Sequence, residues 1–415
     1  MILSQEHKEY WNFMNKLIFR FIFTYIVLYI LLLFLSLSLE DLLRWFADNI
    51  LNWGADFKME STGSGDRAFD YVRLGFNLSL TAPIVLIWSV IDHQRKSYNK
   101  LFYWFQVIIR FTLIFVMLLY GLVKVFKGQF ADHSLERLLQ TVGDMSPMGL
   151  AWTFMGHSLY YNIFIGFAEI LGGILLIFRK TVTLGSIIII GVMSNVLMMN
   201  LTYDIPVKLV SAHLVLMALV LLLANGQRAF DFFFKNKKIE KVEYYFPLKN
   251  RTLKNIILIS KRFLVILVIG IVILQIFIRF RAQEQLKEKS EFYGIWETQI
   301  FVKDMDTIPP LLDNTYRWRY LIVDKKRKAI IKKMTDSLDR YQFEINSDLK
   351  EVIFRRVNDS IPHRFSYTFT NPQQLELNGS LDGDSLFILF NRKPKSDFRL
   401  INRKFHWVNE TNYNH

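Results

Sequence analysis

The sequence predicts a polytopic α-helical membrane protein of about seven transmembrane helices that ends in an antiparallel β domain. Two observations carry this prediction. Several apolar runs reach the roughly 20 helical residues that a hydrocarbon core of about 30 Å requires, and after residue 281 the chain becomes polar with short β-type runs. The apolar runs are residues 17–39, 71–91, 101–123, 160–178, 182–201, 207–224 and 263–280.

These runs divide the chain into five parts. The parts are an N-terminal transmembrane helix pair with an outer loop (1–100), a four-helix membrane core (101–224), a basic cytoplasmic loop (225–262), the seventh transmembrane helix (263–280) and an extracytoplasmic β domain (281–415). The first apolar run is too long for the core of a signal peptide, and no small-residue cleavage site follows it. We therefore expect a retained helix there.

The distribution of charge predicts the orientation. The formal net charge is +14, yet residues 281–415 hold 23 Lys and Arg against 19 Asp and Glu, so most of the excess lies in the membrane part. The excess concentrates at 92–100, 179–180 and 228–262, in alternate loops. By the positive-inside rule the N-terminus is cytoplasmic, and seven spans then place the β domain outside. The basic loops serve as topology determinants or bind anionic lipid headgroups, and we expect no nucleic-acid partner.

The chain contains no cysteine. This excludes disulfides from the β domain, and it excludes thiolate ligation of a metal or an Fe–S cluster from the membrane part. His133 and His157 lie in the second outer loop without ligand spacing, so we predict no metal site. The chain also lacks flavin and haem motifs. We expect no intrinsic cofactor, and hence no electron transfer by this chain alone.

The second outer loop, residues 124–159, is predicted to contain two short helices. HSLERLLQTVG (133–143) has the spacing of an amphipathic helix that ends at Gly143. Ser146 and Pro147 then have the residue types of an N-cap and a first helical position. Two interpretations stay open: a surface helix that joins two spans, and a lid over a cavity.

The β domain reads as an antiparallel meander, either a small up-and-down barrel or a sandwich. It opens with YGIWETQIFV (293–302), in which Gly294 and Trp296 resemble the Gly-x-Trp start of lipocalin-like barrels, where the Trp plugs one end. An ordinary core Trp is the alternative, and barrels of this kind can hold an apolar ligand. The further β-type runs are 316–323, 328–334, 340–345, 351–357, 364–370, 374–379, 385–391 and 398–407.

Glu169 is the one ionisable residue in FIGFAEILGGILLIF (164–178). It lies about nine residues below the outer end of its helix, or ~13 Å at the α-helical rise. A charge at that depth costs at least about 2.5–3.5 kcal/mol on insertion scales, and such groups usually face the interior of a helix bundle. Gly166 and Gly173 share the helix face of Glu169, so another backbone can approach there.

Other spans carry polar residues at similar depths. On the third span, Arg110 and Lys124 belong to one stripe, which predicts an Arg110–Glu169 pair near the middle of the membrane. The predicted cluster consists of Arg110, Glu169, Asn195 and His213, with Lys124, Asp204 and Lys208 toward its outer mouth and Asn77 at a comparable depth on the second span. Such a cluster either locks the helices together or binds a quinone headgroup, a proton or a small polar solute.

Residues 101–224 resemble the DoxX-like family of integral membrane proteins, in its long Bacteroidetes-type form. The third span and four stretches carry the resemblance: YGLVKVFKGQF (120–130), GDMSPMGLAWTFMGHS (143–158), GFAEILGGILLIFRKTVTLG (166–185) and NLTYDIPVKLVSAHLVLMAL (200–219). The resemblance implies a four-helix core in a bacterial inner membrane, and a link to thiosulfate:quinone oxidoreductases and other membrane oxidoreductase complexes. The absence of cysteine leaves no thiol for sulfur chemistry, and the first two spans and the β domain lie outside the family's short form.

Three functions compete at this point. The first is an accessory subunit of a membrane redox or quinone-linked complex, in which the polar cluster binds the quinone and a partner supplies the redox centre. The second is a non-enzymatic envelope scaffold or assembly factor, whose β domain binds a protein, lipid or glycan partner. A transporter ranks last, because the seven spans contain no inverted repeat.

Overall fold

A computed structural model describes residues 10–35, 38–53, 65–224, 290–325, 327–356, 361–403 and 405–411, with scattered residues between 226 and 281. The chain forms two compact units. One comprises Met1–Gln129 and Leu159–Ile276, and the other comprises Phe130–Ser158 and Phe277–His415. Residues 130–158, most of the predicted second outer loop, therefore group with the C-terminal domain rather than with the helices that flank them in the sequence.

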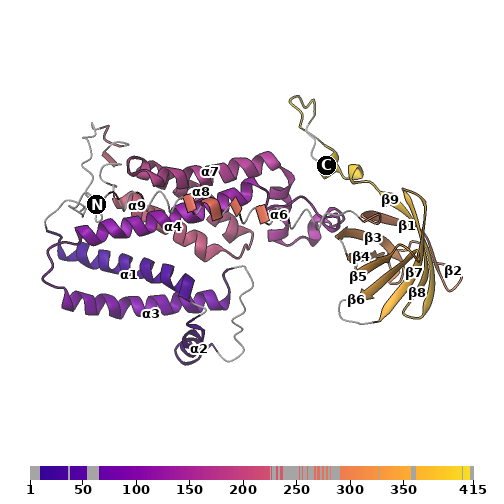
Figure 1. The fold of residues 1–415 in the computed structure, drawn as a ribbon, viewed down its shortest axis with the longest axis horizontal. Helices are drawn as coiled ribbons and strands as arrows, with labels where there is room; N and C mark the ends of the chain where they lie inside the picture. The colour runs from indigo at the N-terminus through magenta and orange to yellow at the C-terminus, as the bar shows by residue number, and fades with distance from the viewer. Residues whose placement is uncertain are drawn as a thin grey trace. The chain divides into compact units, whose positions relative to one another are not determined.

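The first unit is built from long apolar helices, and the chain is a membrane protein (Figure 1). The long helices are α1 (Phe13–Leu35), α3 (Ala68–Ile91), α4 (Asn99–Val125), α7 (Leu159–Ile177), α8 (Val182–Thr202) and α9 (Lys208–Ala224). All but α9 are long and apolar enough to cross a membrane, and α9 is slightly shorter. The predicted basic loop at 225–262 and the predicted seventh span at 263–280 lie largely outside the described residues.

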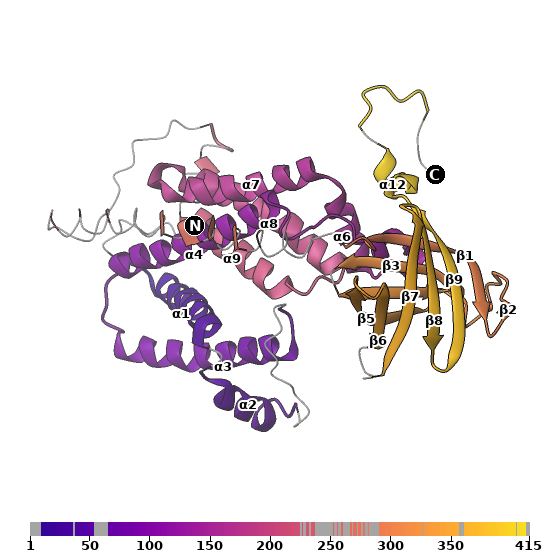
Figure 2. The ribbon, with the colours of Figure 1, turned by 45° about the vertical axis from the view of Figure 1, so that its right-hand side comes forward.

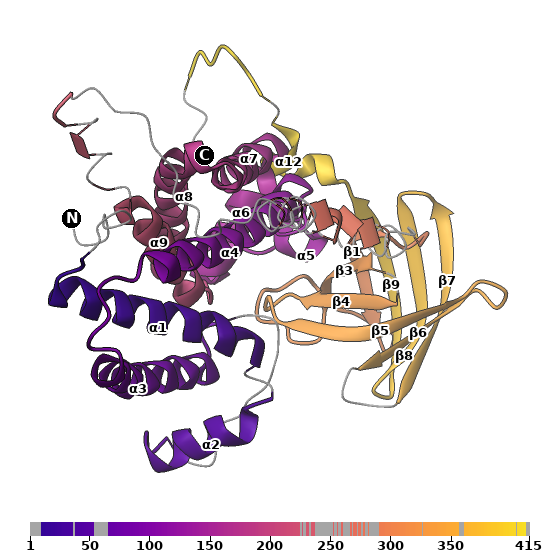
Figure 3. The same ribbon diagram turned by 60° about the vertical axis from the view of Figure 1, so that its left-hand side comes forward.

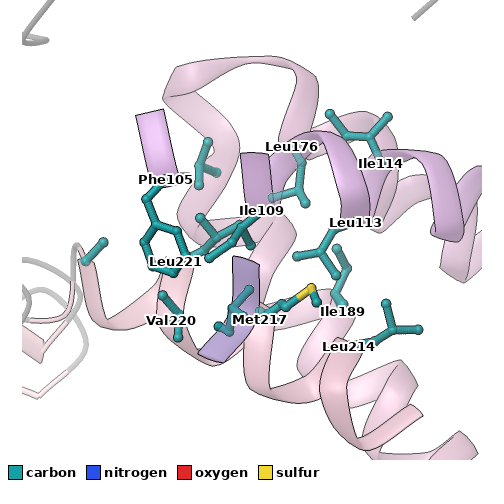
Figure 4. Packing of buried hydrophobic residues seen from close by; sticks show 14 of the residues in the cluster. Phe105, Ile109, Leu113, Ile114, Leu176, Ile189, Leu214, Met217, Val220 and Leu221 are labelled. Atoms are coloured by element: carbon teal, nitrogen blue, oxygen red, sulfur yellow. The ribbon is translucent and has the colours of Figure 1, made fainter. Parts of the chain in front are cut away.

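The interior between α4, α7, α8 and α9 is apolar. Figure 4 shows side chains from all four helices meeting there, among them Leu113, Leu176, Ile189 and Met217. Each of these four side chains is at most 4% exposed. Dispersion contacts and close packing therefore hold the middle of this bundle together.

The N-terminal helices are joined to the bundle by an arginine that the sequence analysis did not single out. Arg20 of α1 is 2% exposed and donates to the Tyr98 hydroxyl at 2.9 Å and to Ser89 Oγ at 2.9 Å. Tyr98 in turn donates to Asp92 at 2.9 Å, directly after α3. Burial alone would raise the pKa of Asp92, but hydrogen bonds from Tyr98, Arg95 and Trp88 outweigh it and hold that pKa below its usual value.

The short helices that connect the long ones differ in part from expectation. In the first outer loop, α2 (Glu40–Asn49) was not predicted, although Leu43 and Phe46 give it a buried face. The helix predicted over 133–143 is only α5 (Leu135–Leu138), followed by a 3₁₀ turn at Val142–Asp144. The predicted start of the next helix is confirmed, because α6 (Pro147–His157) has Ser146 as its N-cap.

The second unit contains a closed antiparallel barrel of eight strands, so the choice between barrel and sandwich is settled for the barrel (Figure 2). Each strand pairs with the next, and β1 also pairs with β9, which closes the sheet. The two-residue strand β2 only extends a hairpin on β1. The strands are β1 (Gly294–Lys303), β2 (Asp306–Thr307), β3 (Trp318–Lys325), β4 (Lys328–Lys333), β5 (Leu338–Asn346), β6 (Glu351–Arg356), β7 (Pro362–Asn371), β8 (Gln374–Leu381) and β9 (Asp384–Lys393).

Aromatic side chains fill the barrel. Ring centroids lie 5.0 Å apart for Phe343 and Phe354, which are partners on neighbouring strands, and 5.9 Å apart for Trp318 and Phe354, which come from strands that do not pair. The largest fully buried side chains of the barrel are Phe292, Trp296, Phe301, Trp318, Phe343, Phe354 and Phe365. This packing gives the barrel a solid core, as in small barrels whose side chains fill the interior.

The predicted first strand is confirmed. Trp296 of β1 is fully buried, donates to the Phe292 carbonyl at 2.8 Å and lies under the Arg392 guanidinium, 5.4 Å from the ring centroid. Gly294 has a φ of 155°, and a Cβ there would come within 3.0 Å of Arg392 Nε. The absence of a side chain at Gly294 thus provides the space that the Arg392 guanidinium occupies over the Trp296 ring.

The last predicted strand, residues 398–407, is wrong. The barrel closes with β9, and the chain continues as a 3₁₀ turn at Lys395–Asp397 and a short helix, α12 (Arg399–Asn402), beyond the end of that strand (Figure 3). Because β1 already pairs with β9, the barrel offers this segment no free edge.

Candidate functional site

A buried ion pair joins α4 and α7. Lys124 Nζ lies 2.6 Å from Glu169 Oε1, and the two side chains are 7% and 1% exposed. The ammonium also lies over the Tyr120 ring, 5.6 Å from its centroid. Glu169 Oε2 is buried and has no hydrogen-bond partner among the residues described. A buried oxygen without a partner can accept one further hydrogen bond, for example from a hydroxyl group or a water molecule, or it can bind a proton.

Glycines bring the two helices close enough for this pair. A Cβ on Gly121 would come within 2.6 Å of the Gly166 carbonyl, and a Cβ on Gly166 would come equally close to the Gly121 carbonyl. Gly173, which follows Glu169 by one helical turn on α7, faces Met117 of α4. The predicted close approach of a backbone beside Glu169 is therefore confirmed, and the approaching helix is α4.

Arg110 does not pair with Glu169, so that prediction is wrong. Its guanidinium donates to the Leu176 carbonyl at 2.5 and 3.0 Å and to the Ile177 carbonyl at 3.1 Å. These carbonyls belong to the last turn of α7, where no helical N–H remains to satisfy them. Leu176 is seven residues beyond Glu169, which is about 10 Å along the helix. Arg110 thus caps the C-terminal end of α7. Neither its residue type nor its depth in the span predicted that carbonyl groups would be its partners.

His213 lies in a separate contact with the N-terminal helices. Its Nδ1 is 2.7 Å from the Leu209 carbonyl, and its Nε2 is 2.7 Å from the Tyr25 hydroxyl. A carbonyl partner requires a proton on Nδ1, so a neutral imidazole accepts from Tyr25 at Nε2. The Tyr29 ring stacks on the imidazole, with centroids 3.6 Å apart. Neither tyrosine was predicted from the sequence, because α1 carries no charged residue within one helical turn of them.

Asn77 belongs to the same contact. It is 1% exposed, donates from Nδ2 to the Tyr25 carbonyl at 3.2 Å and lies beside Thr81 of its own helix. The amide therefore ties α3 to α1, at the residue whose hydroxyl meets His213. Its role here is to hold helices together.

Asp204 and Lys208 form a surface ion pair where the chain passes from α8 to α9. Their charged atoms lie 2.8 Å apart, with side chains 86% and 25% exposed. A residue that was not predicted from the sequence makes stronger contacts with the start of α9 than this pair does. Asp66 of the first outer loop accepts hydrogen bonds from the backbone N–H groups of Lys208 and Leu209, and so caps α9 from a distant part of the chain.

Asn195 does not face the interior. It lies on the exposed face of α8 together with Gly191, whose Cβ position has no heavy atom within 4 Å. The predicted single cluster is therefore not formed. Glu169 and Lys124 form one contact, His213 and Asn77 a second, Arg110 a helix cap, and Asp204 with Lys208 a surface pair.

A cavity lies on the outside of the barrel, within the second unit. Its volume is about 420 Å³. The α5 segment closes one side, because Leu135 N–H donates to Asp324 at 3.2 Å and Glu136 forms an ion pair with Arg340. The lining residues are Ser134, Glu136, Ile322, Asp324, Lys328, Ala329, Ile330, Arg340, Tyr341 and Gln342. From the sequence, only a helix is predicted at this place, with no partner for it.

The described residues contain no group of three His, Asp or Glu side chains that could hold a metal ion. The chemistry that the two buried contacts offer is hydrogen bonding and proton binding. Charged groups on the barrel offer recognition of an external ligand or partner.

Comparison with known proteins finds one informative relative. Over 131 residues, the chain is 37% identical to "Uncharacterized protein YwoB" of Bacillus subtilis (strain 168), an alignment that covers 32% of this chain and 82% of that protein. No family model matches the chain. No solved structure matches it either.

The buried ion pair can be tested by a double-mutant cycle. Glu169→Gln and Lys124→Met should each lower the free energy of unfolding by about 3–5 kcal/mol, because each leaves one buried charge without its partner. The double variant should recover most of that loss. Denaturant titration in bicelles measures all three, and Asp204→Asn is the control, expected to change the free energy by less than ~0.5 kcal/mol. Additive losses in the double variant would contradict a coupled pair.

The glycine contact makes a second prediction. Gly121→Ala should destabilise the bundle by about 1–3 kcal/mol, because the new methyl group overlaps the Gly166 carbonyl. Gly191→Ala is the matched control and should be almost neutral, since nothing lies within 4 Å of its Cβ position. Melting temperatures of the two variants in the same detergent give the comparison. Equal shifts would mean that α4 and α7 do not approach as described.

Proposed function

We propose, for a chain that belongs to the same family as YwoB of Bacillus subtilis, the role of a non-enzymatic envelope scaffold or assembly factor. In this proposal the helices anchor the protein in the bilayer and the β barrel binds a partner protein. The observation that carries it is the charged cavity on the barrel exterior. The filled lumen supports it as well, because the aromatic core takes the space in which other barrels hold an apolar ligand.

The chemistry of the cavity suits a peptide segment. Ile322 and Ile330 supply an apolar floor, and the rim carries charges of both signs: Lys328, Asp324 and the ion pair of Arg340 with Glu136. The volume of about 420 Å³ accommodates a few side chains rather than a whole fold. We infer a partner segment that brings an apolar residue to the floor and polar groups to this rim.

The location forms part of the proposal. We place the chain in a bacterial inner membrane, with a cytoplasmic N-terminus and a periplasmic barrel, from the alternation of basic loops along the sequence. The DoxX-like assignment of residues 101–224 likewise stays a proposal that the motifs quoted above support.

Site-specific photo-crosslinking in cells tests the scaffold role. A photoreactive residue at Gln342, beside the cavity, should capture a defined partner, whereas the same residue at Thr368, an exposed position on β7, should not. Lys328→Glu combined with Ile330→Asp should abolish the capture while the melting temperature of the barrel stays unchanged. Capture that is equal at both positions, or that survives the double substitution, would refute the proposal.

A second candidate is favoured by one specific observation, the unpartnered Glu169 Oε2 beside Lys124. A quinol is lipid-soluble, and one of its hydroxyl groups could donate to this oxygen, whereas the ammonium could donate to a carbonyl of the oxidised quinone. In that case the chain would act as an accessory subunit of a membrane redox complex, and a partner would supply the redox centre.

Titration of the purified protein with decyl-ubiquinol, kept reduced under anaerobic conditions, tests this candidate. Saturable binding is expected for the unmodified chain and for Asp204→Asn, and it should fall at least tenfold in Glu169→Gln. Glu169→Asp, which keeps the charge, separates a loss of binding from a loss of folding. No saturable binding to the unmodified chain, together with unchanged respiration in a deletion strain, would exclude the quinone-linked function.

A further inference from the structure

The exposed surface of α2 divides into an apolar face and a charged face. Leu42 and Trp45 form the apolar face and are 43% and 54% exposed. At 100° per residue they point about 120° away from the buried residues of the helix, which are Leu43, Phe46 and Ala47. A further ~120° around the axis lies the charged face, which consists of Glu40, Asp41, Arg44 and Asp48. The helix thus has separate sides for protein, for an apolar medium and for water.

The buried side of α2 contacts the ends of two membrane spans within the same unit. A Cβ on Gly75 would lie 3.7 Å from Phe46 Cε1 and 3.8 Å from Leu51 Cδ1. Gly75 is seven residues into α3, or ~10 Å along that helix. Leu32, three residues before the end of α1, belongs to the same apolar cluster as Phe46. Because α1 and α3 are long and apolar enough to cross a membrane, α2 lies beside the terminal turns of two spans.

The charges of α3 show where its apolar part begins. Asp70 and Arg73 form an ion pair at 2.8 Å, and no charged residue follows Arg73 within α3. Charged side chains near the end of a span reach the headgroup level, so the acyl-chain region begins close to Gly75. Figure 1 shows α1 and α3 running side by side and α2 turned out of their common direction. A helix at this level lies along the membrane surface, where its apolar face is buried ~5–10 Å into the boundary between headgroups and acyl chains.

We propose that α2 lies in the headgroup layer of the bilayer, with Leu42 and Trp45 in contact with lipid acyl chains. Lipid is the material that surrounds a span at this depth, and tryptophan is enriched at this boundary. The charged face holds three acids against Arg44, which pairs with Glu40 at 2.9 Å. Anionic headgroups therefore gain no attraction from α2, and burial of its apolar face holds it in place. The proposal does not depend on either function proposed above.

The absence of cysteine allows a direct test in the full chain. A bimane fluorophore on Leu42→Cys, in phosphatidylcholine nanodiscs that hold one copy each, should be quenched strongly by phosphatidylcholine with a nitroxide on its acyl chain and weakly by aqueous iodide. Asp48→Cys, on the charged face of the same helix, is the matched control and should show the opposite order, with a several-fold difference for each quencher. Replacing half of the lipid by phosphatidylglycerol should leave the lipid quenching at position 42 unchanged.

Three results would overturn the proposal. The first is equal quenching by the lipid nitroxide at positions 42 and 48. The second is a label at position 42 that neither quencher reaches, because another part of this chain or a second copy would then cover the apolar face. The third is lipid quenching at position 42 that occurs only with phosphatidylglycerol. Both labels replace exposed side chains, so an unchanged melting temperature verifies that folding is intact.

Discussion

The contact between α4 and α7 is the constraint on which the membrane unit depends. Two facing glycines remove the side chains that would separate these helices, and the space so gained places a lysine and a glutamate within one hydrogen bond. Neither half suffices alone. Without the close approach the two charges would each be buried alone, and without the ion pair the glycines would leave a weakly packed seam. The Arg110 cap on the last turn of α7 fixes the same pair of helices at a second level.

Much of the fold follows from hydrophobic length and periodicity. The described spans lie within a few residues of their predicted positions, and the turn signals between β-type runs located eight of the nine strands. The last run failed because closure depends on strand pairing: once β9 reaches β1, Leu400 and Ile401 have no edge to join, however strand-like their sequence is. Local composition contains no information about strand pairing between residues about a hundred positions apart, such as Ile295 and Lys393.

The candidate site was predicted in part. Glu169 was identified correctly as a buried acid beside glycines, and Lys124 was on the expected helix stripe. The partner was wrong, because depth estimated from span limits cannot separate two cations about four turns apart on one helix. Asn195 failed for a different reason: a polar residue in a span is expected to face inward, and α8 instead turns this amide outward. Asp66 escaped notice, because a helix cap supplied by a distant loop leaves no local pattern.

The contact between His213 and the tyrosines of α1 also bears on biosynthesis. Tyr25 of α1 and His213 of α9 are separated by 188 residues. The Tyr25 hydroxyl therefore has no access to this partner until α9 has been synthesised. At synthesis rates of about 5–20 residues per second, that delay is roughly 10–40 s. During this time the hydroxyl group of Tyr25 needs a temporary partner, such as water at the lipid boundary. The helix order thus delays the hydrogen bond of the Tyr25 hydroxyl until residue 213 has been synthesised.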